Sequence, residues 1–183
     1  MDYKMNIAGV DCSLPLCPLN DELYIAAFVM FGQCELTAAC AKELLKKAPE
    51  YDYIITAEAK GIPLAYEMAK QAGDDSYIVA RKKKKLYMNG VFEVNVQSIT
   101  TEGGQYLYLG GDEAKLIKGK KILVVDDVIS TGASLKAVEH LVEQAGGIVA
   151  GRACVLAEGD AATRDDIIFL KELPLFDKNG NAI

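Results

Sequence analysis

The chain has 183 residues, of which 51% are hydrophobic and 25% charged, with a formal net charge of −6. This composition is that of one globular domain that can bury most of a hydrophobic core. The acidic balance argues against a nucleic-acid partner, because phosphate contacts need a basic surface. Every apolar run falls short of the roughly 18 residues that span a bilayer. The first ten residues also lack the basic segment and apolar core of a signal peptide, so we expect a cytoplasmic protein without a membrane partner.

Cysteine and histidine content narrows the chemistry further. The five cysteines form no Cys-x-x-Cys pair, which favours free thiols in a reducing compartment. His140 is the only histidine, so zinc sites and Ser-His or Cys-His catalysis are hard to build. Carboxylates, lysines, hydroxyls and backbone amides must therefore carry the chemistry.

Strand-like and helix-like segments alternate along the chain. In chain order we predict a strand over 24–31, a helix over 37–48, a strand over 53–57, a helix over 63–72, a strand over 77–80, a hairpin from 91–100 and 105–109, a strand over 121–125, a helix over 133–145 and a strand over 148–156. This alternation predicts an α/β fold with a doubly wound, mainly parallel sheet. Such sheets bind ligands at the carboxyl ends of their strands, which singles out the loops after 53–57 and after 121–125.

The loop after 121–125 carries the most specific pattern. Four apolar residues precede the adjacent carboxylates Asp126 and Asp127, and a small, hydroxyl-rich turn then opens a helix. The residues that follow the carboxylates are Val128, Ile129, Ser130, Thr131, Gly132, Ala133 and Ser134. The free N–H groups and partial positive charge of a helix N-terminus suit a phosphate dianion, and Gly132 lets the backbone approach it. The pattern predicts a phosphate site, although neither G-x-x-x-x-G-K-[ST] nor G-x-G-x-x-G occurs.

The two carboxylates must face a group other than the phosphate, because like charges repel. Vicinal ribose hydroxyls donate well to carboxylates, and Mg²⁺ prefers oxygen ligands. A phosphate at the helix end with a diol beside it describes a ribose 5-phosphate. The structural alternative is a strand end with a Ser-Thr cap and two solvated aspartates.

At these residues the sequence resembles the type I phosphoribosyltransferases, and the resemblance extends from about Tyr51 to Leu156. It is most similar to the adenine and xanthine branch. The resemblance implies a Mg²⁺-dependent transfer of the phosphoribosyl group from 5-phosphoribosyl-1-pyrophosphate (PRPP) to a purine, with release of pyrophosphate. It also implies one domain with a base-binding hood over 1–50, a PRPP-binding core over 51–156 and a C-terminal segment over 157–183. A homodimer is common in the family.

The loop after 53–57 reads Glu58-Ala59-Lys60-Gly61 and resembles the family's pyrophosphate loop, where Glu-Ala-Arg-Gly is typical. Lysine in place of arginine still neutralises charge but loses the bidentate fork. The alternative is an ordinary strand-to-helix turn with a surface lysine.

A basic run follows the predicted strand over 77–80. Arg81 and Lys82 match the family's Arg-Lys pair, which implies contact with pyrophosphate. For the next residues, 83–85, a solvated loop is the competing interpretation.

Residues 91–109 are similar to the family's flexible loop, whose closure excludes water from an oxocarbenium-like transition state. The Leu-Glu-Tyr-Gly segment of many adenine-specific members is missing, and Glu102 is the candidate loop residue. The run Asn95-Val96-Gln97-Ser98 is closer to the xanthine-type pattern.

Base recognition is expected from the N-terminal part and from the phosphate site. Phe28, Met30 and Phe31 are candidates for stacking on a purine, with packing in the core as the alternative. Val128 and Ile129 match the family position that flanks the base.

The family's mechanism assigns Lys60 and Arg81 to the charge on the leaving pyrophosphate. It assigns Asp126 and Asp127 to the ribose hydroxyls and, together with PRPP itself, to Mg²⁺. Three alternatives stay open. One is a non-catalytic PRPP sensor, because Ala59 to Tyr66 resembles a segment of bacterial purine repressors. The others are a phosphoribosyltransferase for another acceptor, such as orotate, and a hydrolase or pyrophosphokinase on the same fold.

Overall fold

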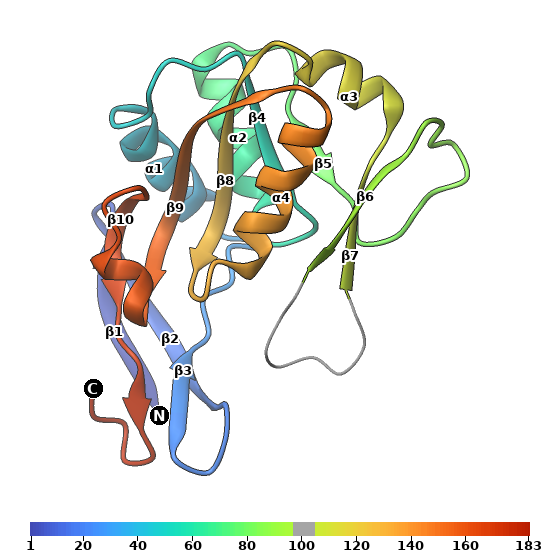
Figure 1. The fold of residues 1–183 in the computed structure, drawn as a ribbon. Helices are drawn as coiled ribbons and strands as arrows, with labels where there is room; N and C mark the ends of the chain where they lie inside the picture. The colour runs from blue at the N-terminus through green and yellow to red at the C-terminus, as the bar shows by residue number, and fades with distance from the viewer. Residues whose placement is uncertain (97–104) are drawn as a thin grey trace.

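The computed structural model describes residues 1–96 and 105–183 (Figure 1). Its described strands form a five-stranded core sheet, a four-stranded small sheet and a two-stranded hairpin. The core sheet has the order β10-β9-β8-β4-β5, and all of its neighbouring strands run parallel. Its strands are β4 (Tyr53–Ala57), β5 (Ile78–Ala80), β8 (Lys121–Ile129), β9 (Ile148–Glu158) and β10 (Ile168–Leu173).

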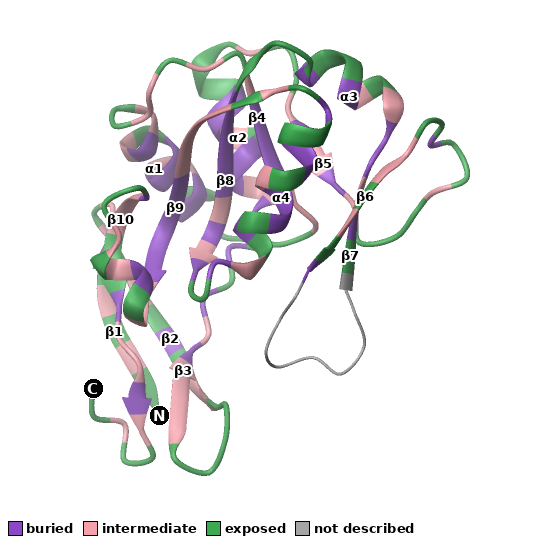
Figure 2. Ribbon diagram, viewed as in Figure 1, coloured by how far each residue is buried: buried purple, intermediate pink, exposed green. Residues whose placement is uncertain are grey.

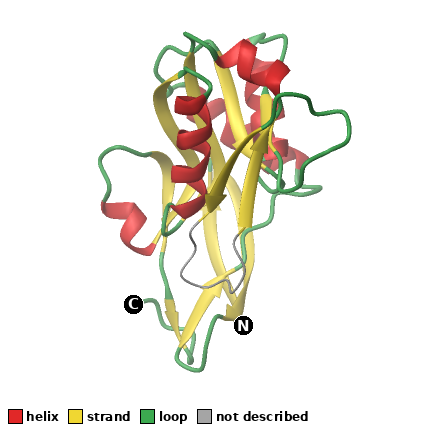
Figure 3. Ribbon diagram, turned by 45° about the vertical axis from the view of Figure 1, so that its right-hand side comes forward, coloured by secondary structure: helices red, strands yellow, loops and turns green. Residues whose placement is uncertain are grey.

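Helices cover both faces of the core sheet, which confirms the doubly wound α/β fold. They are α1 (Cys34–Leu45), α2 (Ile62–Ala72), α3 (Gly111–Ile117), α4 (Ala133–Gln144) and the short 3-10 helix η1 (Gly159–Thr163). In Figures 1 and 3, α4 lies across one face, and α1 and α2 pack together on the other. Gly73 ends α2 in a left-handed conformation with φ 81°, as its position in the sequence predicts.

Successive side chains of β8 point to opposite faces of the core sheet, so this strand contributes to two hydrophobic clusters. Leu123 and Val125 pack in the cluster shared with α1 and α2, whereas Ile122 and Val124 pack in the cluster shared with α4. A strand segment buried on both faces is expected to be a continuous apolar run, and residues 122–125 form one. Figure 2 shows the resulting purple band of buried residues through the central strands.

The chain winds outward in two directions from the middle of the core sheet. From β4 it passes through α2 to β5 at one edge, and from β8 it passes through α4 to β9 and β10 at the other. The carboxyl ends of β4 and β8 therefore meet at the topological switch point, where open α/β sheets bind ligands.

The small sheet is antiparallel, with the order β1-β2-β3-β11. It consists of β1 (Asp2–Ile7), β2 (Val10–Pro18), β3 (Leu23–Ala26) and β11 (Phe176–Asp177). The predicted strand over 24–31 is wrong beyond Ala26. Residues 27–31 leave the sheet as a connection in which Phe28 and Met30 enter the core, whereas Val29 and Phe31 stay exposed.

The predicted hairpin is confirmed by β6 (Phe92–Val96) and β7 (Gln105–Leu109), which pair antiparallel. Its predicted turn at residues 102–104, with Glu102, lies outside the described residues. The inner face of the hairpin packs against α4 through Val96, Leu107 and Leu109. Backbone hydrogen bonds between Arg81 and Tyr108 join β7 to the residue that follows β5.

Strands β8 and β9 are both longer than predicted, and β9 continues to Glu158. β8 continues to Ile129, so Asp126 and Asp127 belong to the strand and not to a loop after it. Asp126 lies opposite Cys154 of β9 in the ladder between the two strands. This pairing fixes the backbone of both carboxylates before any ligand arrives.

Candidate functional site

Two segments from the ends of β4 and β8 touch at the switch point. Gly61, just before α2, packs closely against Thr56 of β4 and Asp126 of β8, so that a Cβ atom there would overlap Oγ1 of Thr56 and lie 3.2 Å from Oδ1 of Asp126. Only a residue without a side chain fits this contact. The segment Glu58 to Gly61 and the acidic pair Asp126 and Asp127 therefore form one structural unit.

The two carboxylates of the acidic pair differ in environment. Asp127 is 2% exposed, whereas Asp126 is half-buried. Burial and the neighbouring charge of Asp127 raise the pKa of Asp126 to about 8. The backbone N–H of Asp127 donates to Oδ1 of Asp126 at 2.9 Å, which fixes that carboxyl group in place.

Lys60 balances the charge of the acidic pair. Its Nζ lies 2.9 Å from Oδ2 of Asp127, while its side chain stays half exposed. That oxygen is buried and has no partner of hydrogen-bonding geometry in the described parts of the chain. The contact is therefore an ion pair without a directed hydrogen bond, and a ligand that attracts Lys60 can replace it.

The phosphate loop, which we define as residues 130–134, leads from β8 into α4. Gly132 adopts a left-handed conformation with φ 77°, which favours glycine. The N-cap of α4 is Gly132, which has no side chain to cap the helix, and the N–H of Ala133 donates a long hydrogen bond of 3.4 Å to Oγ1 of Thr131. The other N–H groups of the first turn can meet an anion. A cavity of about 180 Å³ opens here, lined by Val96, Asp126, Val128, Ile129, the phosphate loop and Leu135.

A second cavity of about 190 Å³ lies beside the first. Its lining combines acidic, basic and aromatic side chains: Ala57, Glu58, Ala59, Lys60, Lys82, Val96, Tyr106, Leu107, Asp126, Asp127, Val128 and Ser134. The two cavities share Val96, Asp126, Val128 and Ser134. They form one elongated site with a helix N-terminus at one end and Lys60 and Lys82 at the other.

Glu58 organises the basic end of this site. Its Oε2 accepts a hydrogen bond of 2.9 Å from the backbone N–H of Lys82 and lies 3.6 Å from Nε of Arg81. Nε of Arg81 is buried and makes no hydrogen bond within the described residues. The peptide bond between Glu58 and Ala59 is cis. Glu58 thus connects Arg81 and Lys82 to the segment that holds Lys60. Of the two, Lys82 lines the second cavity, whereas Arg81 lines a separate pocket next to Tyr87.

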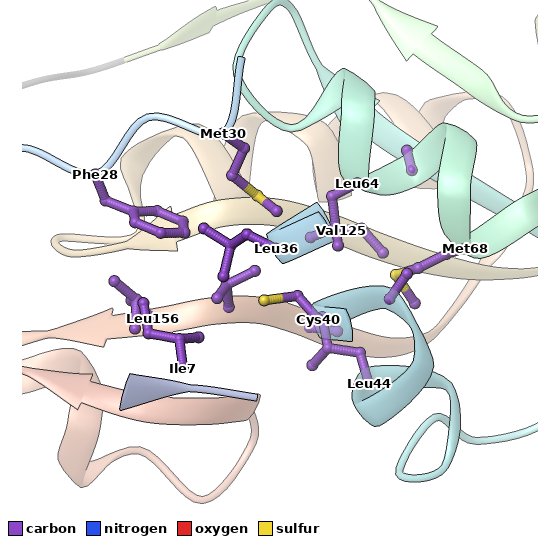
Figure 4. Close-up of a cluster of buried hydrophobic side chains, with 14 of the residues drawn as sticks. Ile7, Phe28, Met30, Leu36, Cys40, Leu44, Leu64, Met68, Val125 and Leu156 are labelled. Atoms are coloured by element: carbon purple, nitrogen blue, oxygen red, sulfur yellow. The ribbon is translucent and has the colours of Figure 1, made fainter. Parts of the chain in front are cut away.

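The aromatic candidates for base stacking lie elsewhere. Phe28 and Met30 are 4% and 1% exposed and pack in the core cluster with Leu36 and Leu156 (Figure 4). Phe31 is 51% exposed. None of the three lines either cavity in the part of the molecule that the structure describes. Core packing accounts for Phe28 and Met30, whereas Val128 and Ile129 do line the site.

Three residues near the site were missed by sequence reasoning. Thr56 is fully buried beneath Gly61, Tyr106 lines the second cavity, and Arg164 approaches the phosphate loop from the C-terminal part of the chain. Thr56 is the second-last residue of a predicted strand, but its contact with Gly61 has no sequence signal. Tyr106 lies in the predicted hairpin, but the face of the hairpin on which its side chain lies follows only from the register of β6 and β7.

The site also offers oxygen ligands for a divalent cation. Groups of three or more His, Cys, Asp or Glu side chains suited to a metal are absent from residues 1–96 and 105–183. The buried Oδ2 of Asp127 is instead an acceptor that lacks a hydrogen bond, next to a second carboxylate. Two carboxylates that share a cation with substrate oxygens are the usual way in which proteins bind Mg²⁺. The donor set therefore fits Mg²⁺ that arrives with a phosphorylated substrate.

Comparison with known proteins identifies the family. A family model described as a phosphoribosyl transferase domain matches residues 34–180, so the chain belongs to that family. A hypoxanthine/guanine phosphoribosyltransferase of Methanococcus voltae is 39% identical over 113 residues, which cover 62% of this chain and 56% of the relative. One from Methanothermococcus okinawensis is 38% identical over 111 residues, which cover 61% and 56%. The chain thus matches little more than half the length of these curated relatives.

Solved structures confirm the fold. The adenine phosphoribosyltransferase of Thermoanaerobacter pseudethanolicus superposes with a TM-score of 0.70 at 20% identity, covering 87% of this chain and 95% of that one. The adenine phosphoribosyltransferase of Rhodothermus marinus gives a TM-score of 0.69 at 22% identity, covering 87% and 94%. None of the helices in the described ranges has the length and hydrophobicity to cross a bilayer.

Proposed function

We propose that this protein is a purine phosphoribosyltransferase that transfers the phosphoribosyl group of PRPP to a purine base and releases pyrophosphate. The observation that carries the proposal is the contact between the two segments at the switch point. It places the acidic pair between the N-terminus of α4 and the basic residues Lys60 and Lys82. That spacing of charge matches the phosphate, diol and pyrophosphate of PRPP in order.

The two ends of the site have separate roles in binding. The phosphate loop binds the 5′-phosphate through its backbone N–H groups and the hydroxyls of Ser130, Thr131 and Ser134. Asp126 and Asp127 accept hydrogen bonds from the ribose hydroxyls. Mg²⁺, held by these carboxylates and by oxygens of PRPP, would supply further positive charge at the pyrophosphate.

The chemical step breaks the bond between ribose C1 and the pyrophosphate oxygen and forms a bond between C1 and a purine nitrogen. Positive charge develops at C1 and negative charge on the leaving group. The acidic pair stabilises the former, and Lys60, Lys82 and Arg81 stabilise the latter. Pyrophosphate leaves with the bonding electron pair, and the purine nitrogen loses its proton. Holding both reactants in one site supplies much of the acceleration.

For the base we propose a 6-oxopurine: hypoxanthine, guanine or xanthine. The curated relatives are named for hypoxanthine and guanine. The sequence lacks the Leu-Glu-Tyr-Gly segment of adenine-specific members, and its Asn95-Val96-Gln97-Ser98 run is similar to the xanthine type. Adenine is the second candidate, supported by the names of the structural neighbours. We also propose a homodimer, as the resemblance to the family implies. The cytoplasm is proposed as its location, as expected from the first ten residues.

The deciding experiment measures pyrophosphate release from PRPP and Mg²⁺ with hypoxanthine, guanine, xanthine and adenine in separate reactions. Release that depends on one base establishes the activity and names the acceptor. As a control, the double variant Asp126→Asn with Asp127→Asn should lose on the order of a hundredfold or more in turnover while the fold survives.

Failure of all four bases would contradict the proposed enzyme. If PRPP still raised the melting temperature in that case, the sensor interpretation would take its place.

A further inference from the structure

Arg164 approaches the phosphate loop from a distant part of the sequence. It directly follows η1, on the connection between β9 and β10. A Cβ atom built on Gly132 would lie 2.8 Å from Nη1 of Arg164. The guanidinium group therefore packs directly against the loop backbone, and a side chain at position 132 would displace it.

One edge of this guanidinium group is fixed by Asp166. Nε and Nη2 of Arg164 donate hydrogen bonds of 2.9 and 2.8 Å to the two carboxylate oxygens. This bidentate geometry leaves Nη1 directed at Gly132. The two parallel hydrogen bonds to Asp166 hold the long side chain of Arg164 in one orientation, which a lysine could not achieve.

A second pair connects Asp166 to the helix of the site. Nε of Arg152 on β9 lies 3.7 Å from Oδ2 of Asp166 and also pairs with Glu139 of α4. The charges alternate in sign from Glu139 through Arg152 and Asp166 to Arg164. Arg152 thus shares the network with Arg164 and offers a matched control.

The electrostatics of the phosphate loop need such a cation. Residues 130–134 contain no basic side chain, and the acidic pair lies at their start. Asp166 holds the pKa of Arg164 above its ordinary value, and Arg164 lowers that of Asp166, so both stay charged across the working range. A phosphate dianion in the first cavity would have Arg164 as a cation behind the loop.

We propose that Arg164 is a positioning residue for the 5′-phosphate of the substrate: held by Asp166, it supports the backbone at Gly132 and adds positive charge behind the loop. The proposal rests on the function proposed above and extends it to a residue outside the sequence motif. Arg164 acts through the loop, so it affects binding of the ribose phosphate end more than the chemical step or the pyrophosphate end.

The test compares Arg164→Gln, Arg164→Lys and Arg152→Gln with the wild-type protein. Calorimetry measures the affinities for ribose 5-phosphate and for pyrophosphate with Mg²⁺, and steady-state kinetics gives KM for PRPP and kcat. Arg164→Gln should weaken ribose 5-phosphate binding and raise KM for PRPP by about tenfold, with pyrophosphate affinity and kcat nearly unchanged. Arg164→Lys, which keeps the charge, should recover part of the loss. Arg152→Gln should stay close to wild type.

Three results would overturn the proposal. They are wild-type affinity of Arg164→Gln for ribose 5-phosphate, an equal loss for pyrophosphate, and an equal loss in Arg152→Gln. If Arg164→Gln does not fold, Asp166→Asn provides the test, because it keeps the charge of Arg164 and removes the bidentate contact that orients it. Its ribose 5-phosphate affinity should fall, and no change would again overturn the proposal.

The outcome for Arg164 can be separated from that of the proposed reaction. A wild-type protein that binds ribose 5-phosphate but releases no pyrophosphate with any base contradicts the enzyme and still tests Arg164 by binding. A wild-type protein that binds no ribose 5-phosphate overturns the inference itself.

Discussion

Nζ of Lys60 lies 2.9 Å from Oδ2 of Asp127 and thereby joins the segment after β4 to the carboxylates of β8. In the ligand-free protein this lysine neutralises a buried carboxylate. In the proposed reaction it must also face pyrophosphate. The same cation therefore contributes to the stability of the free protein and to the binding of the leaving group.

Replacing Lys60 should affect both properties. Lys60→Ala leaves the Asp127 carboxylate buried without a cation, but the lysine is half exposed, so we expect a loss of only about 1 kcal/mol in unfolding free energy. Pyrophosphate affinity should fall, and Lys60→Arg should retain most of it. Urea denaturation and calorimetry measure the two effects. Lys115→Ala, which breaks an exposed pair with Asp112, is the control. Unchanged pyrophosphate binding in Lys60→Ala would refute the assignment.

The raised pKa of Asp126 makes stability depend on pH. Its folded value of about 8 exceeds the ordinary value of 3.8, so the folded protein holds a proton that the unfolded chain releases. This contribution to the stability of the folded protein is complete below the unfolded-state pKa of 3.8. It is lost as pH rises through the folded-state pKa of about 8. Asp126→Asn removes the ionisation, so its stability relative to wild type should increase between about pH 5 and about pH 8 in denaturant titrations. The exposed Asp112→Asn should show no such trend, and parallel curves for Asp126→Asn would exclude the raised pKa.

Gly61 should not tolerate a methyl group. The added Cβ of Gly61→Ala would overlap Oγ1 of Thr56 in β4 and lie 3.3 Å from Cα of Asp126 in β8. We expect destabilisation of about 1–3 kcal/mol, together with lower activity because the two segments are pushed apart. Adding Thr56→Ala removes the nearest atom and should restore part of the stability. If the double variant is no more stable than Gly61→Ala, the clash lies elsewhere. Thermal unfolding of the four proteins gives the comparison.

Two neighbouring tyrosines offer a matched test of the second cavity. The rings of Tyr106 and Tyr108 stack with centroids 6.2 Å apart, but only Tyr106 lines the cavity. Tyr106→Phe keeps the ring and removes the hydroxyl, so KM for PRPP should rise by roughly threefold to tenfold if that hydroxyl contacts the substrate. Tyr108→Phe should have wild-type kinetics. Equal effects of the two changes would assign them to the packing of the hairpin.

Sequence patterns located the site because its physics is local. The phosphate loop needs a glycine with positive φ at a helix start, and that requirement is visible in the order of residues at 130–134. The apolar run before it had to be a strand buried on both faces. The contact between Lys60 and Asp127 of β8 followed from the parallel sheet, because neighbouring strands end at the same edge.

Other features depend on long-range packing and left no local signal. Asp126 and Asp127 were placed after their strand because carboxylates rarely lie in a buried sheet, yet pairing with β9 extends β8 through them. Helix α3 has only seven residues and no long apolar period. Phe28 could not be assigned to the core or to a base site from its sequence, because both environments favour an aromatic side chain.

Strand β11 has a consequence for biosynthesis. It pairs with β3, so the small sheet is completed by residues from the opposite end of the chain, and Figure 1 shows the two termini close together. Closing so large a loop is slow relative to local folding. During translation the edge of β3 would stay unpaired until residues 176–177 have left the ribosome. A fragment that ends after β9 should therefore expose that edge and aggregate, even though it contains every residue of the proposed active-site motifs.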